Sequence, residues 1–330
     1  MRARARPHTQ ARIAAQESNG DYPVADESHR TCIEAVLTRH VYEAVQEETR
    51  MGASLLRLHF HDCFVHGCDA SILLDEENGE KFSPGNKDSV RGYELVDIMK
   101  ESITSQCRVQ ISCADILALA ARAGVQAVSP PHRMPIWNVT IGRYDSKYSY
   151  ANLTGALPGT DEPMDKLMQK FADQSITDVK EFIALIGGGH TIGLNHCGFA
   201  KRRLYGNDTT NLYSDPEYIT FLEHMCPETQ SVQHDAEVSI ALDNKTMNIF
   251  DNGFFASLHK GRVGIKSDQL LGDPNNPSEI RAAVELFTDN EDAFLEAFSA
   301  GMETMGNNGI LGSDEGEIRA ECRHPNGNYR

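Results

Sequence analysis

The stretch Arg57-Leu58-His59-Phe60-His61-Asp62-Cys63-Phe64 decides how this chain is interpreted. Arg57 and His61 are four residues apart, so in a helix they share one face and can reach one small substrate. Flanking apolar residues favour a helix, and Ser54 is a candidate N-cap. A guanidinium beside an imidazole pairs a fixed positive charge with a group that exchanges a proton near neutral pH. Taken alone, the pair also fits a core histidine beside a surface arginine.

The residues that follow this stretch are rich in oxygen atoms. Asp62, Asp69 and Ser71 lie in a short loop with Gly67, beside two cysteines. Carboxylates, a hydroxyl and free loop carbonyls are hard ligands of the kind that calcium prefers. The sequence therefore predicts a calcium site directly after His61.

The overall composition is that of an ordinary soluble globular protein. The 330 residues can form one large domain or two lobes, and 40% of them are hydrophobic and 24% charged. A formal charge of −17 argues against nucleic-acid partners and against anionic membrane surfaces. No apolar run approaches the roughly 20 residues of a membrane span, so no membrane partner is expected.

Eight cysteines are spread along the chain, which fits either disulfides in an oxidising compartment or buried thiols. Zinc is not expected, because no paired Cys-x-x-Cys spacing is present. Residues 1–16 are rich in arginine and lack the apolar core of a secretory signal, so an organelle-directed presequence is an alternative. We expect residues 1–18 to be a disordered tail.

Apolar residues recur at helical spacing along most of the chain. Met51-Gly52 is expected to end the first helix, and Thr177 is a candidate cap for a later one. Residues 75–90 are turn-rich, and residues 138–160 are loop-like. A short helix is expected around Arg57 and His61. The longer predicted helices cover residues 27–50, 91–105, 113–128, 163–175, 177–187, 277–289 and 291–306.

The motif Arg-Leu-His-Phe-His-Asp-Cys-Phe-Val, followed by Gly-Cys-Asp-Ala-Ser, resembles the distal-haem segment of the secretory plant peroxidases, or class III peroxidases. The run Gly187-Gly188-Gly189-His190-Thr191-Ile192-Gly193 resembles their proximal-haem motif, and its glycines permit close approach of a flat ligand. The resemblance spans about residues 20–325. It implies an all-α fold of about ten helices, with a distal lobe (19–160) and a proximal lobe (161–310) around haem in a domain of residues 19–325, and a tail at 326–330.

The resemblance implies one haem b with His190 as the iron ligand. Asp268 would accept the other N–H of His190. On the open face His61 would be the general base for hydrogen peroxide, with Arg57 stabilising the charge that develops. Asn86 would orient His61. Phe60 is expected to wall the pocket, and the exposed haem edge would be lined by Phe199 and Pro158, for which ordinary packing is the alternative.

Two calcium ions are also implied, and each would fix the backbone beside one histidine. The distal ion would be held by Asp62, Val65, Gly67, Asp69, Ser71 and, through water, Glu80. The proximal ion would be held by Thr191, Asp243, Thr246, Ile249 and Asp251. The implied disulfides favour secretion, and they are Cys32–Cys107, Cys63–Cys68, Cys113–Cys322 and Cys197–Cys226.

The chain departs from the family pattern at several positions. Leu242 stands where an aromatic residue is usual, and Pro84 replaces a commonly aromatic access residue. The glycine run before His190 is one residue longer than the usual secretory pattern. Sequons at Asn138, Asn152 and Asn207 are expected to carry glycans after secretion, whereas Asn244 is not, because Thr246 would bind calcium.

We therefore expect a monomeric haem peroxidase that reduces hydrogen peroxide and oxidises phenolic or similar small aromatic donors in one-electron steps. A scavenger that uses another donor such as ascorbate is an alternative, favoured by the long glycine run and the arginine-rich N-terminus. A haem-poor structural or binding protein with the same fold is a further alternative, for which Leu242 is the only support.

Overall fold

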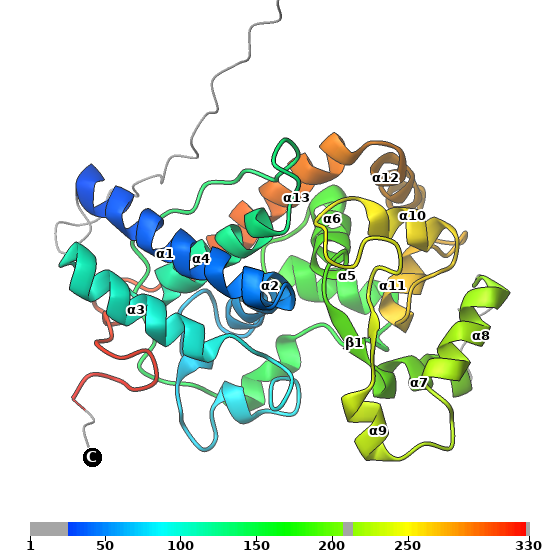
Figure 1. Cartoon of the computed structure of the whole chain (residues 1–330), viewed down its shortest axis with the longest axis horizontal. Helices are drawn as coiled ribbons and strands as arrows, with labels where there is room; N and C mark the ends of the chain where they lie inside the picture. Colours follow the sequence, from blue (N-terminus) through cyan, green and yellow to red (C-terminus); the bar gives the residue numbers. More distant parts are fainter. Residues whose placement is uncertain (1–25, 207–213, 328–330) are drawn as a thin grey trace, which may run out of the picture.

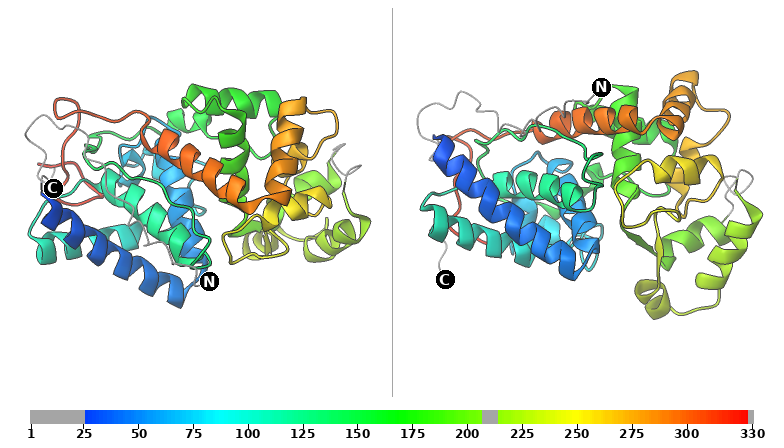
Figure 2. Two further views of the ribbon diagram at one scale, coloured as in Figure 1. Left: turned by 90° about the horizontal axis from the view of Figure 1, so that it is seen from above. Right: turned by 45° about the horizontal axis from the view of Figure 1, so that its top comes forward.

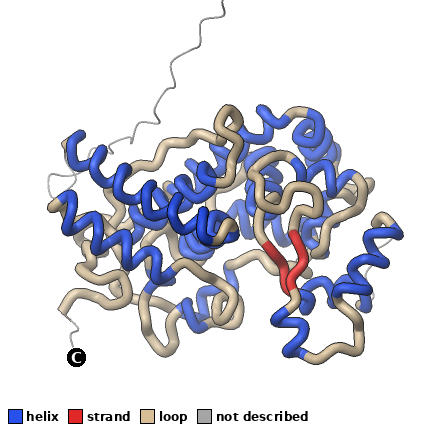
Figure 3. The backbone as a smooth tube through the Cα atoms, viewed as in Figure 1, coloured by secondary structure: helices blue, strands red, loops and turns tan. Residues whose placement is uncertain are grey.

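The computed structural model describes residues 26–206 and 214–327, and these residues are mostly helical, with one short pair of strands (Figure 3). The mostly helical content agrees with the predicted all-α fold. The expected tail at residues 1–18, the sequon at Asn207 and residues 328–330 lie outside the described residues. Within the described ranges, no helix is both long and apolar enough to cross a membrane.

Four helices from the first part of the chain pack together on the left of Figure 1. α1 lies against α3 and α4, and α2 lies against α4. Two glycines allow this last contact, because a Cβ at Gly52 would lie 2.8 Å from the carbonyl oxygen of Gly124. The bounds are α1 Glu27–Glu47, α2 Arg50–Cys63, α3 Tyr93–Cys107 and α4 Cys113–Ala127.

A second group of helices surrounds α6. α13 packs along α6 and also touches α2, so it joins the two groups (Figure 2). Gly187 and Gly188 of α6 lie against aromatic rings: added Cβ atoms would come within 2.3 Å of Phe255 and 2.2 Å of Phe298. The bounds are α5 Met164–Asp173, α6 Val179–His190, α10 Gly253–His259, α11 Lys266–Leu271, α12 Ser278–Asp289 and α13 Glu291–Gly306.

A smaller unit sits at the lower right of Figure 1, between α6 and α10 in the sequence. Its two strands pair antiparallel, with Asn195 opposite Ile240. It has a small core of its own, which includes Tyr218 and Leu222. The bounds are β1 Leu194–His196, α7 Cys197–Tyr205, α8 Pro216–Met225, α9 Val232–Glu237 and β2 Ser239–Ala241. Three short 3₁₀ helices lie in the loops of the first half, at Ser71–Leu73, Glu80–Phe82 and Ala151–Ala156.

The predicted boundaries are wrong at three places. Met51-Gly52 lies inside α2, because α1 already ends at Glu47. Ser54 is also inside α2, where its hydroxyl donates to the Arg50 carbonyl instead of capping the helix. Asp178, not Thr177, caps α6, since its carboxylate accepts from the backbone N–H groups of two following residues. The estimate of about ten helices omits short ones such as α9 and α11.

Four disulfides tie these elements together, and within the described residues no cysteine is free. The structure pairs the same cysteines as the family resemblance implies. The longest loop is closed by Cys113 and Cys322, 209 residues apart, which anchors the C-terminal segment to α4. The other pairs are Cys32–Cys107, Cys63–Cys68 and Cys197–Cys226.

A line of phenylalanine rings connects α2 to α6 through α5. Phe60 and Phe64, at the end of α2, have ring centroids 4.2 Å apart. The Phe64 ring meets Phe171 of α5 edge-on at 4.9 Å, and Phe171 meets Phe182 of α6 at 4.9 Å. Edge-to-face contacts of this kind stabilise aromatic pairs beyond the area they bury. The rings therefore set the spacing between the two helices.

Candidate active site

Arg57 and His61 lie on one face of α2, as their spacing predicts, and they are in contact. The Arg57 Nε donates a hydrogen bond of 3.1 Å to His61 Nε2. The two Nη atoms of Arg57 donate to the Ser89 carbonyl at 2.9 Å and to the Ser89 hydroxyl at 2.7 Å. Ser89 therefore fixes the guanidinium beside the histidine. The sequence analysis missed Ser89, because nothing near it marks it as a partner of Arg57.

Asn86 holds the other nitrogen of His61. Its Oδ1 lies 2.6 Å from His61 Nδ1, and its Nδ2 donates to the Glu80 carbonyl at 2.8 Å. Because the amide nitrogen is committed to Glu80, the amide oxygen faces the imidazole and accepts from Nδ1–H. His61 is therefore held as the tautomer whose Nε2 is unprotonated, and in this structure that nitrogen accepts the hydrogen bond from Arg57 Nε. This is the arrangement that a general base requires.

The surroundings keep His61 neutral and Arg57 charged. Burial, reinforced by the positive charge of Arg57, lowers the pKa of His61 to about 3. Part of the Arg57 side chain is open to solvent, but its guanidinium lies deep among protein atoms, and burial lowers its pKa to about 10. At neutral pH the pair is thus an unprotonated imidazole beside a cation.

A second histidine is held in a matching way at the end of α6. His190 Nδ1 lies 2.7 Å from Asp268 Oδ1, which α11 supplies and which is fully buried. The carboxylate takes the Nδ1 proton, so Nε2 of His190 keeps its electron pair. In the described residues no hydrogen bond engages that Nε2. The ring of Phe254 packs edge-on against His190 with centroids 6.3 Å apart.

The glycine run has a different role from the predicted one at two of its three positions. α6 continues to His190, so the run is helical and the predicted end at residue 187 is three residues early. Gly187 and Gly188 make room for phenylalanine rings of the protein, not for a ligand. A Cβ at Gly189, in contrast, would meet nothing within 4 Å, so the position beside His190 is open. An axial histidine with a free Nε2 and an open neighbour fits haem.

The four side chains of the predicted distal calcium set are all buried. Asp62 and Asp69 are fully buried, and Ser71 and Glu80 are nearly so. Each has an oxygen without a hydrogen-bond partner: Asp62 Oδ1, Asp69 Oδ2, Ser71 Oγ and Glu80 Oε2. Unpaired buried carboxylate oxygens are costly, so their convergence fits a bound cation. Burial and the neighbouring Asp69 raise the pKa of Asp62 well above its ordinary range and that of Glu80 to about 7.

Val65 and Gly67, the other two residues of the predicted distal set, lie in the same loop, which turns at Gly67. Gly67 has a φ of 134°, and a Cβ there would lie 2.4 Å from the Gly309 carbonyl oxygen, so only glycine fits. The Gly67 carbonyl accepts from Asp69 N at 2.9 Å. The Val65 N–H bonds to the Asp62 carbonyl at 3.3 Å.

The proximal calcium set also comes together. The Thr246 hydroxyl lies 2.7 Å from Asp243 Oδ2 and 2.8 Å from Asp251 Oδ1. One hydroxyl proton can serve only one of these oxygens, so the arrangement of the three oxygens fits a cation. Thr191 donates to the Asp251 carbonyl at 2.7 Å, which joins this loop to the residue after His190. The remaining predicted residue, Ile249, has an exposed side chain.

The predicted substrate edge is spread over separate elements. Phe60 is half-buried, 5.6 Å from the His61 ring. Phe199 of α7 is half-buried beneath Arg202, whose guanidinium lies 5.3 Å from the ring centre. Pro158 is half-buried in the loop after the third 3₁₀ helix. Ordinary packing explains the half-buried positions of Phe199 and Pro158 as well as a role at the substrate edge does.

The departures from the family pattern are accommodated locally. Leu242 is buried, and its N–H donates to the Gly193 carbonyl, so it packs below the end of α6. Pro84 is exposed in the turn before Asn86. The sequons at Asn138 and Asn152 are both exposed.

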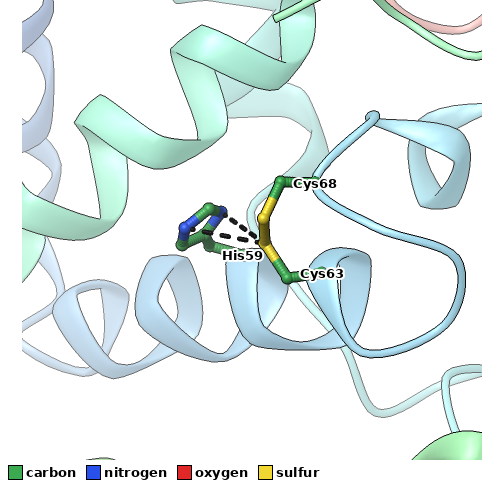
Figure 4. A group of neighbouring side chains, drawn as sticks. All are labelled: His59, Cys63 and Cys68. Atoms are coloured by element: carbon green, nitrogen blue, oxygen red, sulfur yellow. Dashed lines mark hydrogen bonds between the residues drawn. A yellow bond between two sulfur atoms is a disulfide. The ribbon is translucent and has the colours of Figure 1, made fainter. Parts of the chain in front are cut away.

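One further cluster contains His59, Cys63 and Cys68 (Figure 4). The Cys63 sulfur lies 3.6 Å from His59 Nδ1. The two sulfurs are bonded to each other, so they are not available as metal ligands. Burial lowers the pKa of His59 to about 3, and it is a neutral core residue.

Comparison with known proteins identifies the family. A family model described as Peroxidase matches residues 37–290. Peroxidase 11 of Arabidopsis thaliana is 38% identical over 301 residues, which cover 88% of this chain and 87% of the relative. Peroxidase C2 of Armoracia rusticana is 36% identical over 304 residues, covering 89% and 85%. Peroxidase 15 of Ipomoea batatas is 38% identical over 309 residues, covering 90% of each.

These relatives give no support to a haem-poor binding protein or to a scavenger with another donor. The match extends over nearly the whole of this chain and of each relative. It includes both segments that carry the paired histidines. The chain therefore belongs to the peroxidase family, in its class III plant-type group, and is a haem-dependent enzyme that reduces hydrogen peroxide at the expense of a reducing substrate.

Proposed function

We propose that His61, Arg57 and Asn86 carry out the reaction with hydrogen peroxide, and that His190 and Asp268 hold the haem. A single haem b would lie between a distal lobe (residues 19–160) and a proximal lobe (residues 161–310). When bound, haem would supply the redox chemistry, which is oxidation by hydrogen peroxide and reduction in one-electron steps. Gly189 leaves space for its flat ring, and Phe60 would wall the pocket.

His61 moves the proton in this proposal. Its unprotonated Nε2, which peroxide would reach in place of the Arg57 hydrogen bond, takes a proton from one oxygen of hydrogen peroxide and returns it to the other, which leaves as water. The Arg57 cation stabilises the negative charge on that departing oxygen. Asn86 keeps Nδ1 protonated, so Nε2 remains the basic atom. Asp268 does the same for His190, whose Nε2 is then available to iron.

Two calcium ions support these histidines. The distal ion would bind through Asp62, Val65, Gly67, Asp69, Ser71 and Glu80, and the proximal ion through Thr191, Asp243, Thr246, Ile249 and Asp251. Support comes from the unpaired oxygens of the distal set and the shared Thr246 hydroxyl of the proximal one.

The proposed reducing substrates are phenols and similar small aromatic molecules. The proposed protein is a secreted monomer without nucleic-acid or membrane partners, since four disulfides are best kept in an oxidising compartment and the net charge is −17. Glycans at Asn138 and Asn152 would follow from secretion.

One observation carries the proposal. Two histidines at the ends of two touching helices each have Nδ1 bound to a fixed acceptor, at 2.6 Å and 2.7 Å. Both therefore present an Nε2 electron pair, one with a cation beside it and one without. This difference fits His61 as the base, with Arg57 beside it, and His190 as the metal ligand.

The test is the optical response of haem-loaded protein to hydrogen peroxide. We expect a five-coordinate ferric spectrum that changes on one equivalent of peroxide and returns when a phenol is added. His61→Ala should slow the peroxide step by about 10²- to 10⁴-fold while keeping the haem spectrum. The exposed His132 supplies the control His132→Ala, which should react at the parent rate.

The donor is tested separately by comparing a small phenol with ascorbate. Faster reduction by the phenol supports the proposed substrate class. Ascorbate as the faster donor would contradict it and leave the peroxide step intact. A His61→Ala protein that reacts with peroxide as fast as the parent would refute the assigned base.

A further inference from the structure

Two tyrosines, Tyr148 and Tyr150, project side by side from the surface. Their side chains are 60% and 48% exposed. The rings are stacked, with centroids 6.2 Å apart and planes inclined by 24°. Neither belongs to the haem or calcium sets described above.

The backbone holds both rings on one side. Tyr150 has an extended backbone, with φ −132° and ψ 104°, and in extended chain alternate side chains point the same way. Between them Ser149 points inward, 3% exposed, and its hydroxyl accepts from Glu80 N at 2.9 Å. The Tyr148 carbonyl accepts from the Ser146 hydroxyl at 2.8 Å. The segment is thus anchored below both rings.

We propose that Tyr148 and Tyr150 are a self-modification site, at which turnover of the enzyme joins the two rings by a carbon–carbon bond. This rests on the proposed oxidation of phenols, because tyrosine is itself a phenol. Each ring loses its hydroxyl hydrogen atom as one electron and one proton. The two radicals couple at the carbons next to the hydroxyls, and both rings then regain their aromatic form.

The reaction balances with the oxidant that the enzyme already uses. Two electrons and two protons leave the tyrosine pair, and one hydrogen peroxide accepts them to give two waters. The exposed rings can deliver electrons to the oxidised enzyme or to the radical of a small phenolic donor that it has released. No other reactant is needed.

Neighbouring rings make coupling within the chain faster than coupling between molecules. Holding two reacting groups together replaces a bimolecular encounter by an effectively unimolecular step. Tyr42, a further exposed tyrosine among the described residues, stands on α1 and forms no ring pair there. Tyr93 and Tyr218 are buried and are not accessible to a diffusing oxidant.

The experiment treats the haem-loaded enzyme with small increments of hydrogen peroxide, with and without a small phenol, and maps tryptic peptides by mass spectrometry. Cleavage after Lys147 and Lys166 places both tyrosines in the single peptide 148–166. We expect this peptide to lose two hydrogen atoms and to gain the blue fluorescence of linked tyrosines. Tyr148→Phe and Tyr150→Phe should each abolish the change, whereas Tyr42→Phe should leave it intact.

A parallel arm oxidises tyrosines without haem, using light, tris(bipyridyl)ruthenium and persulfate. If light links the tyrosines but peroxide does not, although the enzyme oxidises the phenol, the proposal is overturned, because turnover then does not oxidise the pair. Linking by neither route overturns it on geometry. Tyrosine links that join separate molecules also contradict it. An enzyme that fails to oxidise the phenol shows instead that the proposed function is wrong, and self-modification fails with it.

Discussion

His61 shows at the scale of one residue how the protein sets a chemical role. Asn86 binds one ring nitrogen, Arg57 binds the other, and the Glu80 carbonyl fixes Asn86. A histidine in water would exchange tautomers and be partly protonated near neutral pH. Here burial and the adjacent cation favour the neutral ring. The result is a base that is ready at neutral pH.

The pH dependence of the peroxide reaction follows from this. A base acts only when unprotonated, so the rate should be flat near neutrality and fall as the pH approaches about 3, the pKa of His61. Stopped-flow measurement of the rate constant against pH tests it. Asn86→Ala should slow the reaction and move the fall to lower pH, because the Asn86 hydrogen bond raises the pKa of His61. A fall near pH 6.5, the ordinary histidine value, would contradict the assigned environment.

Individual residues were the part that sequence could predict best. The spacing of Arg57 and His61 within an apolar segment predicts a shared helix face, and the structure has them in contact. The bond from Asn86 to the Glu80 carbonyl depends on how a turn folds back, and the segment of 75–90 shows only that a turn is present. Side-chain partners across loops are set by tertiary packing, which local patterns do not encode.

At the scale of elements, the position of α6 depends on the absence of a Cβ at Gly187 and Gly188, which lets the helix lie against phenylalanine rings. Gly188→Ala would drive a Cβ into the Phe298 ring, and overpacking of this kind costs about 1–3 kcal/mol. We expect a lower free energy of unfolding in urea and weaker haem retention, because α6 carries His190. Gly189→Ala is the matched control, since its Cβ meets nothing within 4 Å. It should fold at least as stably as the parent, and equal losses in both variants would contradict the packing argument.

Calcium removal should change how stability depends on pH. Burial raises the pKa of Glu80 from 4.5 to about 7, so without a cation the folded state holds a proton that the unfolded state releases. Stability should then be lost as the pH rises from about 4.5 through about 7. Calcium, which needs the carboxylates, should reverse this trend.

Thermal unfolding with chelator and with calcium, across that pH range, measures the effect. Glu80→Gln removes one titrating group and leaves Asp62, whose pKa is also raised, so the chelator curve should become less steep. A chelated protein whose melting temperature rises with pH through this range would contradict the assignment.

The sequence predicted where the helices lie better than it predicted where each helix begins and ends. The apolar pattern predicts α1, α4, α12 and α13 within a few residues, because each presents a long stripe to the core. The end of α6 was missed, since three glycines suggest a loop. Contacts with Phe255 and Phe298, distant in sequence, keep those glycines helical.

For the whole molecule, the disulfide between Cys113 and Cys322 closes the largest loop. Loop-closure entropy for 209 residues predicts that its removal costs about 5 kcal/mol, within the usual range of a few kcal/mol. Replacing both cysteines by alanine should lower the unfolding midpoint clearly and free the C-terminal segment to proteolysis. In the matched variant, Cys63 and Cys68 are replaced by alanine. These cysteines are only 5 residues apart, so the loss of loop-closure entropy predicts a smaller decrease in the free energy of unfolding. Equal losses would show that strain or local packing, not chain entropy, governs these bonds.

The line of rings from Phe60 to Phe182 has a consequence for the space between the helices. Close-packed phenyl rings resist compression, so this line of rings limits how closely α2 and α6 approach along its length. The width available to a flat ligand then depends also on Phe64, Phe171 and Phe182, which belong to none of the proposed haem, calcium or substrate sets. Shortening Phe171 to leucine would let the gap narrow and alter haem affinity, with both histidines and all their hydrogen bonds in place.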